Sequence, residues 1–348
     1  MNIRFYSLIC LLAVLGFNSY AFFDKKVKSQ STQTTIQNKL PVVFHKDYDI
    51  SLMGLQKLHP FDSCKYGKVF KFLGNYYQKN RFHIPEKISD SELLKVHSKE
   101  YLDSLSQSAV IAQITEIALL EYVPNFILQR YFIHAMKLAT GGTVLGSQLA
   151  LEHGWAINLS GGYHHAKHDC GGGFCAFADI PLAIIKIWEK QPEYTVMIVD
   201  LDAHQGNGHE SFFVGDARVI IYDIYNGQIY PQDFKARKRI DYNYPVKSGI
   251  KDDEYLALLA STLPAALEES KPNFIIYNAG TDIFEEDPLG RMKISAAGIK
   301  QRDELVFKLA HERNIPILMV LSGGYTKKSA DIISDSLLNI LTNVLRIS

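Results

Sequence analysis

The strongest constraint on the fold is an alternation of short apolar runs with helix-length segments in the second half of the chain. The apolar runs are 155–159, 194–199, 218–224, 273–278 and 315–321, and the helical segments are 177–190, 253–270, 295–313 and 327–346. This alternation predicts an α/β fold: a single large parallel β-sheet with helices on both faces. In such sheets functional residues gather beyond the carboxyl ends of the strands.

The first half of the chain reads mainly as helical. We expect one strand at 41–44 and helices at 65–79, 89–95, 98–121 and 125–152, the last containing Gly141-Gly142. No internal repeat forces a second domain, so we interpret 41–348 as one catalytic domain preceded by a polar lead-in over 22–40. The chain has 348 residues, 47% hydrophobic, and a formal net charge of +0. Without a basic block, nothing favours nucleic-acid binding.

The N-terminus resembles an export signal. Arg4 precedes an apolar run over 5–17, and Ser19 and Ala21 are small residues at −3 and −1 of a cut after Ala21. We favour a cleaved signal peptide over 1–21, and an uncleaved anchor is the alternative. Either predicts a protein that acts outside the cytoplasm, periplasmic or secreted, or delivered into another cell. Cleavage would leave three cysteines, an odd number.

Histidine, aspartate and tyrosine follow four of the predicted strands, beside glycines that allow sharp turns. These residues are His164 and His165 after 155–159; Asp200, Asp202 and His204 at the end of 194–199; Asp282 after 273–278; and Tyr325 after 315–321. One such strand end occurs by chance, but four at one edge of a sheet favour a functional site over a purely structural explanation.

Asp202, His204 and Asp282 are candidate metal ligands. On an extended backbone residues two apart point the same way, so Asp202 and His204 are expected to converge. Three protein ligands leave zinc an open position, which is the catalytic arrangement. Iron(II) or manganese would also accept these ligands. The alternative for this stretch taken alone is a turn whose aspartates cap the next helix.

The pair His164-His165 could supply proton transfer for amide hydrolysis, which needs a base for water and an acid for the leaving amine. Asp200 could hold one imidazole in the required tautomer. Tyr325 could donate to a developing oxyanion, or could be an ordinary tyrosine after a turn. The glycine-rich stretch 170–175 reads as a close-packed loop or as a slot for a narrow substrate. Its Cys175 is more easily explained as a buried structural residue than as a reactive one.

These motifs resemble those of the zinc-dependent histone deacetylases, and within them class IV, in the arginase/deacetylase superfamily. The resemblance covers about residues 44–345. The segments that carry it are MGLQKLHPFD (53–62), ATGGT (139–143), HGWAINLSGGYHHAKHDCGGGFCAFADI (153–180), VDLDAHQGNGHE (199–210), YNAGTDIFEEDPLGRMKIS (277–295) and LMVLSGGY (318–325). The signal-like N-terminus is not part of that pattern.

The resemblance implies roles residue by residue. It implies zinc ligands at Asp202, His204 and Asp282, and tandem histidines at His164 and His165, of which the second acts as general base and acid. It also implies a transition-state tyrosine at Tyr325 and a tunnel for the acylated lysine lined by Gly173 and Phe174. A structural potassium site is implied around Asp200, Asp202, His204 and Asp223. Most classes place a carboxylate behind the second histidine, where this chain has Asn207. We interpret Asn207 as a mark of class IV, and expect it to leave His165 less basic.

The expected function is therefore hydrolysis of the acyl amide of lysine in proteins, with histones among the candidate substrates, using zinc-activated water. Two alternatives keep the chemistry and change the substrate: acetylpolyamines or other small amides, and long-chain fatty-acyl lysine. A third alternative is a non-catalytic binding module. We expect no nucleic-acid partner and no membrane contact beyond the N-terminal segment.

Overall fold

The structure is a computed structural model that describes residues 39–50 and 64–347. The predicted signal or anchor, and the lead-in up to residue 38, lie outside these residues, so their assignment stays a prediction. The described residues from Leu40 onward belong to one compact unit. Among the residues that the structure describes, no helix is both long enough and apolar enough to cross a membrane.

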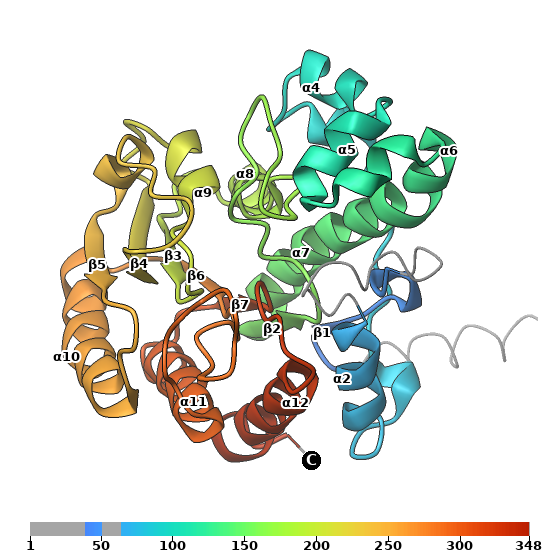
Figure 1. The fold of residues 1–348 in the computed structure, drawn as a ribbon. Helices are drawn as coiled ribbons and strands as arrows, with labels where there is room; N and C mark the ends of the chain where they lie inside the picture. Colours follow the sequence, from blue (N-terminus) through green and yellow to red (C-terminus); the bar gives the residue numbers. More distant parts are fainter. Residues whose placement is uncertain (1–38, 51–63, 348) are drawn as a thin grey trace, which may run out of the picture. The chain divides into compact units, whose positions relative to one another are not determined.

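One seven-stranded sheet in which all neighbouring strands run parallel forms the centre of this unit (Figure 1). Its strands are β1 (Val42–Val43), β2 (Trp155–Asn158), β3 (Val196–Asp200), β4 (Val219–Asn226), β5 (Tyr242–Val246), β6 (Phe274–Asn278) and β7 (Ile317–Val320). They lie in the order β1-β2-β7-β6-β3-β4-β5. The predicted α/β fold with a single parallel sheet is confirmed.

Helices surround this sheet. They are α2 (Lys65–Leu73), α3 (Asp90–Leu93), α4 (Lys99–Ser104), α5 (Ser108–Thr115), α6 (Asn125–Leu128), α7 (His134–His153), α8 (Asp179–Lys190), α9 (Asn207–Phe212), α10 (Asp252–Ser270), α11 (Ala296–Glu312) and α12 (Ser329–Asn339). Short π-helical stretches, η5 (Gln129–Ile133) and η7 (Ile340–Val344), precede α7 and follow α12.

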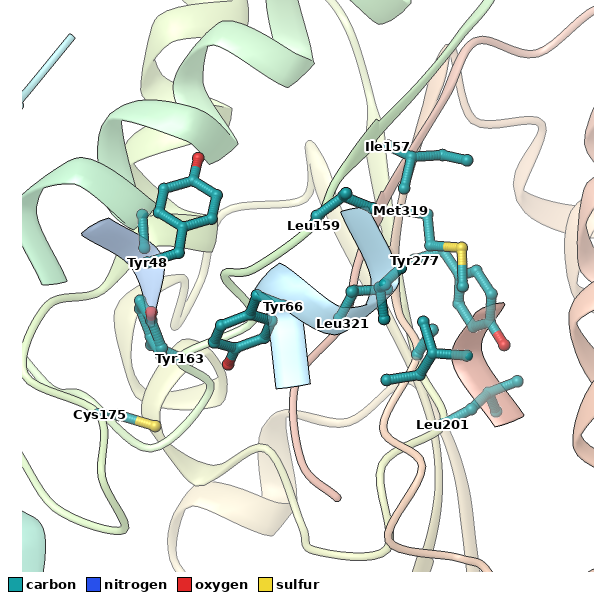
Figure 2. Packing of buried hydrophobic residues seen from close by; sticks show 14 of the residues in the cluster. Tyr48, Tyr66, Ile157, Leu159, Tyr163, Cys175, Leu201, Tyr277, Met319 and Leu321 are labelled. Atoms are coloured by element: carbon teal, nitrogen blue, oxygen red, sulfur yellow. The ribbon is translucent and has the colours of Figure 1, made fainter. Parts of the chain in front are cut away.

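Alternate residues of the strands face two separate apolar layers. On β3, Val196 and Ile198 pack with side chains of α7 and α8, whereas Met197 and Val199 pack with α10, α11 and α12. Figure 2 shows part of the second layer. Because both faces are covered, β3 has no polar residue until its last position, Asp200. Burying a side chain of this size contributes roughly 1.5–3 kcal/mol, so the two layers hold the strand ends in fixed register.

The helical predictions for the first half were partly wrong. The expected helix over 98–121 is broken at the serine-rich segment 104–108 into α4 and α5, and the expected helix over 65–79 ends at Leu73. Serine competes for backbone hydrogen bonds: the Ser104 hydroxyl bonds the carbonyl of Tyr101.

The pair Gly141-Gly142 lies inside α7, as expected, because neighbouring atoms approach the helix closely. A Cβ on Gly141 would lie 2.0 Å from the carbonyl oxygen of Glu86, and one on Gly142 would lie 2.0 Å from the Tyr48 hydroxyl. The glycines therefore serve packing between α7 and the segments that hold Glu86 and Tyr48.

Candidate active site and metal centre

The polar residues that follow the strands meet because β3 and β6 end level with each other, while the neighbouring β4 passes beside the end of β3. In the register of the sheet, Asp200 of β3 lies beside Asp223 of β4 on one side and Asn278 of β6 on the other. The loops that leave β3 and β6 carry Asp202, His204 and Asp282, and all three of these residues are buried. The sheet register thus brings together residues about 80 positions apart.

Ligand atoms of Asp202, His204 and Asp282 all lie within 4.8 Å of one another. The Nδ1 of His204 is 2.8 Å from Oδ2 of Asp282 and 3.1 Å from Oδ1 of Asp202. The reason predicted for this convergence was wrong, because β3 ends at Asp200 and Asp202 is not on a strand. A loop brings the side chains together instead: the backbone N–H of Asp202 donates to Asp200, and that of His204 donates to Asp202.

Neighbouring groups hold the two carboxylates in place. Oδ1 of Asp282 accepts from the backbone N–H of Ala203 at 2.8 Å. Oδ2 of Asp202 accepts from the Ser322 hydroxyl and from the Gly323 N–H, both at 2.9 Å. A Cβ on Gly323 would lie 2.5 Å from Asp282 Oδ2 and 2.6 Å from Asp202 Oδ2, so only glycine fits between these carboxylates.

The chemistry of these three residues fits a divalent metal ion. Burial raises the pKa of Asp282 to about 7, and the neighbouring charge of Asp202 adds to this rise. Two buried carboxylates this close need a compensating charge. A dication held by two carboxylate oxygens and an imidazole nitrogen would supply it, and this donor set suits zinc as well as iron(II).

The two tandem histidines have different partners and opposite pKa shifts. Nδ1 of His164 is 2.8 Å from Asp200 Oδ2, and Nδ1 of His165 is 2.8 Å from Asn207 Oδ1. Burial opposes a charge on His164, but the carboxylates of Asp200 and Asp202 outweigh it and raise the pKa to about 9. Burial lowers the pKa of His165 well below 6.5, and the charge of His164 lowers it further. The pair therefore holds one charged and one neutral imidazole.

A pocket leads to this group. Its walls include His165, His204, Gly173, Phe174 and Tyr325, so the predicted tunnel residues and the tyrosine line the same cavity. The ring of Tyr325 meets that of His204 edge to face, with centroids 6.1 Å apart. Burial, with the nearby Asp282 carboxylate, raises the pKa of Tyr325 well above 10, so its hydroxyl remains a hydrogen-bond donor at neutral pH.

The sequence reasoning missed the rest of the pocket wall. The missed residues are Glu116, Gln228, Ile229, Tyr230, Gln232, Pro288, Leu289 and Arg291. Three of them, together with Phe174, are non-glycine residues with a positive φ: Glu116 at 55°, Gln232 at 51° and Arg291 at 53°. Strained backbone of this kind concentrates at functional sites, but the amino-acid sequence does not reveal it.

The residues assigned by resemblance to a potassium site also lie together. Asp223 is fully buried, lies inside β4 rather than after a strand, and accepts from the Gly206 N–H through Oδ2 at 3.1 Å. Its Oδ1 has no hydrogen-bond partner among the described residues. A buried carboxylate oxygen without a donor fits coordination of a cation, which would compensate the charges of Asp223 and Asp200.

Comparison with known proteins places this chain in a family. The model of the histone deacetylase domain matches residues 59–341. Histone deacetylase 2 of Arabidopsis thaliana is 49% identical over 305 residues, covering 87% of this chain and 79% of that protein. Histone deacetylase 1 of Bos taurus is 29% identical over 307 residues, covering 83% of this chain and 62% of that protein. The chain belongs to the histone deacetylase family, which is a family of hydrolases.

A solved structure supports the fold. The crystal structure of the HDA15 HD domain superposes with a TM-score of 0.68 at 20% sequence identity, covering 86% of this chain and 88% of that one. The arginase/deacetylase-like arrangement is therefore shared by both proteins.

Proposed function

We propose that this protein is a zinc-dependent lysine deacylase that hydrolyses the acyl amide of lysine side chains in proteins. One observation carries the proposal: His204, a member of the metal-ligand group of Asp202, His204 and Asp282, lines the same pocket as the neutral imidazole of His165. Hydrolysis of an unactivated amide needs an electrophile for the carbonyl and a base for water at the same point.

A bound zinc ion would polarise the acyl carbonyl and lower the pKa of water beside it. The protein's own groups handle the protons. Nδ1–H of His165 donates to Asn207 Oδ1, an orientation supported by the Asn207 amide nitrogen, which faces Asp233 at 3.5 Å. Nε2 of His165 is then free to take a proton from the attacking water. The same nitrogen later protonates the amine of lysine as the carbon–nitrogen bond breaks.

Tyr325 stabilises the charge that develops on the carbonyl oxygen, and His164 controls the protonation of His165. Tyr325, which lines the same pocket, offers its hydroxyl as a donor to this oxygen. His164, charged through its contact with Asp200, lies with its ring centroid 4.1 Å from that of His165. Its positive charge keeps His165 neutral until it accepts a proton, so the tandem pair divides electrostatic and proton-transfer roles.

For the substrate we favour acylated lysine in proteins, with histones included, because the Arabidopsis relative carries the name histone deacetylase. The pocket lining includes Glu116 and Arg291, one negative and one positive charge. A polycation such as an acetylpolyamine would gain little from such a wall. We assign the chain to class IV on the basis of Asn207. Lysine with a long-chain acyl group is the second candidate substrate, to be compared with acetyl-lysine.

The test is turnover of the zinc-loaded protein on an acetyl-lysine peptide, a myristoyl-lysine peptide and an acetylpolyamine. We expect the peptides to be hydrolysed, and His165→Ala and Tyr325→Phe each to lower kcat by about 100-fold or more. Wild-type rates in both folded variants would contradict the mechanism. Preferred turnover of the acetylpolyamine would contradict the substrate.

We also propose that the chain is exported, on the basis of residues 1–21. Fractionation of cells that express the full chain, with N-terminal sequencing of the product, tests this. Protein found outside the cytoplasm with its N-terminus at Phe22 would support a cleaved signal. Full-length protein in the membrane fraction would support the anchor, and full-length protein in the cytoplasm would contradict both.

A further inference from the structure

Arg302 is a fully buried arginine on α11, and it is not among the residues that line the pocket. A buried guanidinium loses its hydration, so a position in the core is stable only when its donors are satisfied. A methionine of similar length would fill such a position without that requirement. The partners of Arg302 therefore indicate what the charge does.

A single nitrogen of Arg302 joins the two loops that carry the metal ligands. Nη1 donates to the carbonyl of Leu201 at 3.0 Å and to the carbonyl of Gly280 at 2.6 Å. Leu201 immediately precedes Asp202, and Gly280 lies two residues before Asp282. Because both carbonyls bind the same nitrogen atom, the guanidinium fixes the separation of the two backbones directly behind the two carboxylate ligands.

The guanidinium is itself held by an ion pair. Nε and Nη2 of Arg302 each lie 2.8 Å from Oδ1 of Asp303, and the Tyr277 ring lies under the guanidinium with its centroid 5.8 Å away. The Tyr277 hydroxyl from β6 and the Ser336 hydroxyl from α12 both donate to Asp303. Figure 2 shows Tyr277 and Leu201 in the same region of the core. Three elements thus orient the arginine toward the ligand loops.

We propose that Arg302 is a positioning residue that sets the spacing of Asp202 and Asp282, and through it the affinity and coordination geometry of the metal. The inference rests on the proposed metal site. Residues that orient metal ligands from behind typically change metal affinity 10- to 100-fold when they are lost. Without Arg302, two buried carbonyls lose their donor, and the loops of Asp202 and Asp282 are no longer joined.

The chain offers a matched control in Arg239. This arginine also donates to backbone carbonyls, of Phe213 at 2.7 Å and of Asp216 at 3.1 Å, and it also pairs with a nearby aspartate, Asp241, at 2.7 Å. Neither carbonyl lies beside a proposed metal ligand. Arg239→Met therefore removes the same kind of interaction from another part of the fold.

The experiment compares wild type, Arg302→Met and Arg239→Met by competition with a chelator for zinc and by the visible absorption spectrum of the cobalt(II)-loaded proteins. We expect about 10- to 100-fold weaker zinc binding and an altered cobalt spectrum for Arg302→Met alone. Wild-type affinity and spectrum in folded Arg302→Met would overturn the proposal, as would equal losses in both variants. Arg302→Lys keeps the charge but not the planar, multi-donor head group, so an intermediate loss is expected.

If Arg302→Met fails to fold, Arg302→Met/Asp303→Asn removes both charges and leaves an amide whose oxygen can accept from Tyr277 and whose N–H can donate to the Ser336 hydroxyl. The same results are expected of it. The underlying site is tested separately with Asp202→Asn. Zinc binding that depends on Asp202 but not on Arg302 overturns only the positioning role, whereas binding that does not depend on Asp202 contradicts the proposed function.

Discussion

Nδ1 of His165 lies 2.8 Å from an amide oxygen of Asn207, whereas Nδ1 of His164 lies 2.8 Å from a carboxylate oxygen of Asp200. Two adjacent imidazoles thus lie at the same distance from their oxygen partners and differ in the charge of those partners. The amide fixes the tautomer of His165 but raises its pKa less than burial lowers it, so the pKa of His165 falls well below 6.5.

Asn207→Asp is expected to raise the pKa of His165, because a carboxylate at hydrogen-bond distance favours the charged imidazole. His165 would then become protonated, and inactive as a base, at a higher pH than in wild type. The acidic limb of kcat/KM should move up by about one pH unit or more. The measurement is a pH–rate profile on an acetyl-lysine peptide. Superimposable profiles would contradict the role given to Asn207.

Lys65 supports the turn that carries Tyr325. Its buried ammonium donates to the carbonyls of Ser322 at 2.7 Å and Gly323 at 2.8 Å. Lys65→Met should lower the free energy of unfolding by about 2–3 kcal/mol, since bonds from a charged donor contribute roughly 1.5–3 kcal/mol. It should also lower kcat more than it raises KM. Lys71→Met, at an exposed position of the same helix, is the control in urea unfolding and kinetics.

Removal of the metal is expected to lower thermal stability, because Asp202 and Asp282 are buried together and repel each other without a cation. Zinc at a thousandfold excess over its Kd should stabilise the fold by about 4 kcal/mol. Calorimetry with a chelator, then with zinc restored, measures this change. Asp282→Asn should abolish the zinc-dependent rise in Tm, and Asp233→Asn should keep it. A rise in both variants would mean that the ion binds elsewhere.

The buried ring of His97 is expected to make the fold less stable in mild acid. Its Nε2 accepts from the Ala178 N–H at 3.0 Å, and its Nδ1 faces the carbonyl of His168 at 3.3 Å, which requires a neutral ring. Burial lowers the pKa of His97 to about 4. The unfolded chain binds a proton below about pH 6.5, so stability is complete above that pH and falls as the pH drops toward 4.

Between pH 7 and pH 5 the contribution of His97 should fall by about 2 kcal/mol. Urea unfolding of wild type and His97→Gln at both pH values measures the difference. The variant should be less stable at pH 7 but less sensitive to acid. An equal decline in both proteins would show that other groups carry the pH dependence.

The sequence was sufficient for the features that depend on local pattern. Apolar runs without alternation indicated strands buried on both faces. Polar residues at the ends of these strands indicated a functional site at one edge of the sheet. The edge strand β5 was missed because none of its residues is fully buried and it contains Pro245, which is tolerated only where a ladder hydrogen bond is not needed. Local pattern gives no strong signal for such a strand.

Contacts between distant segments could not be predicted in this way. The residue Arg302 reads in sequence as an ordinary helical arginine, and only its contacts with Leu201 and Gly280 reveal its position behind the ligands. Likewise, Tyr230 lines the pocket from the segment between β4 and β5, and no local pattern marks it. Such roles follow from tertiary geometry, which one sequence does not encode in its periodicity.

The strand order has a consequence for synthesis of the protein on the ribosome. The last strand to be made, β7, lies between β2 and β6 in the middle of the sheet. Until residues 317–320 emerge, β1 and β2 have no hydrogen-bonded connection to the other strands, and Tyr325 does not yet exist. A domain generally folds as a unit, so the sheet is complete only after β7 has been made, and a chain that stops short of β7 has additional open strand edges at β2 and β6 and lacks Tyr325 in the pocket wall.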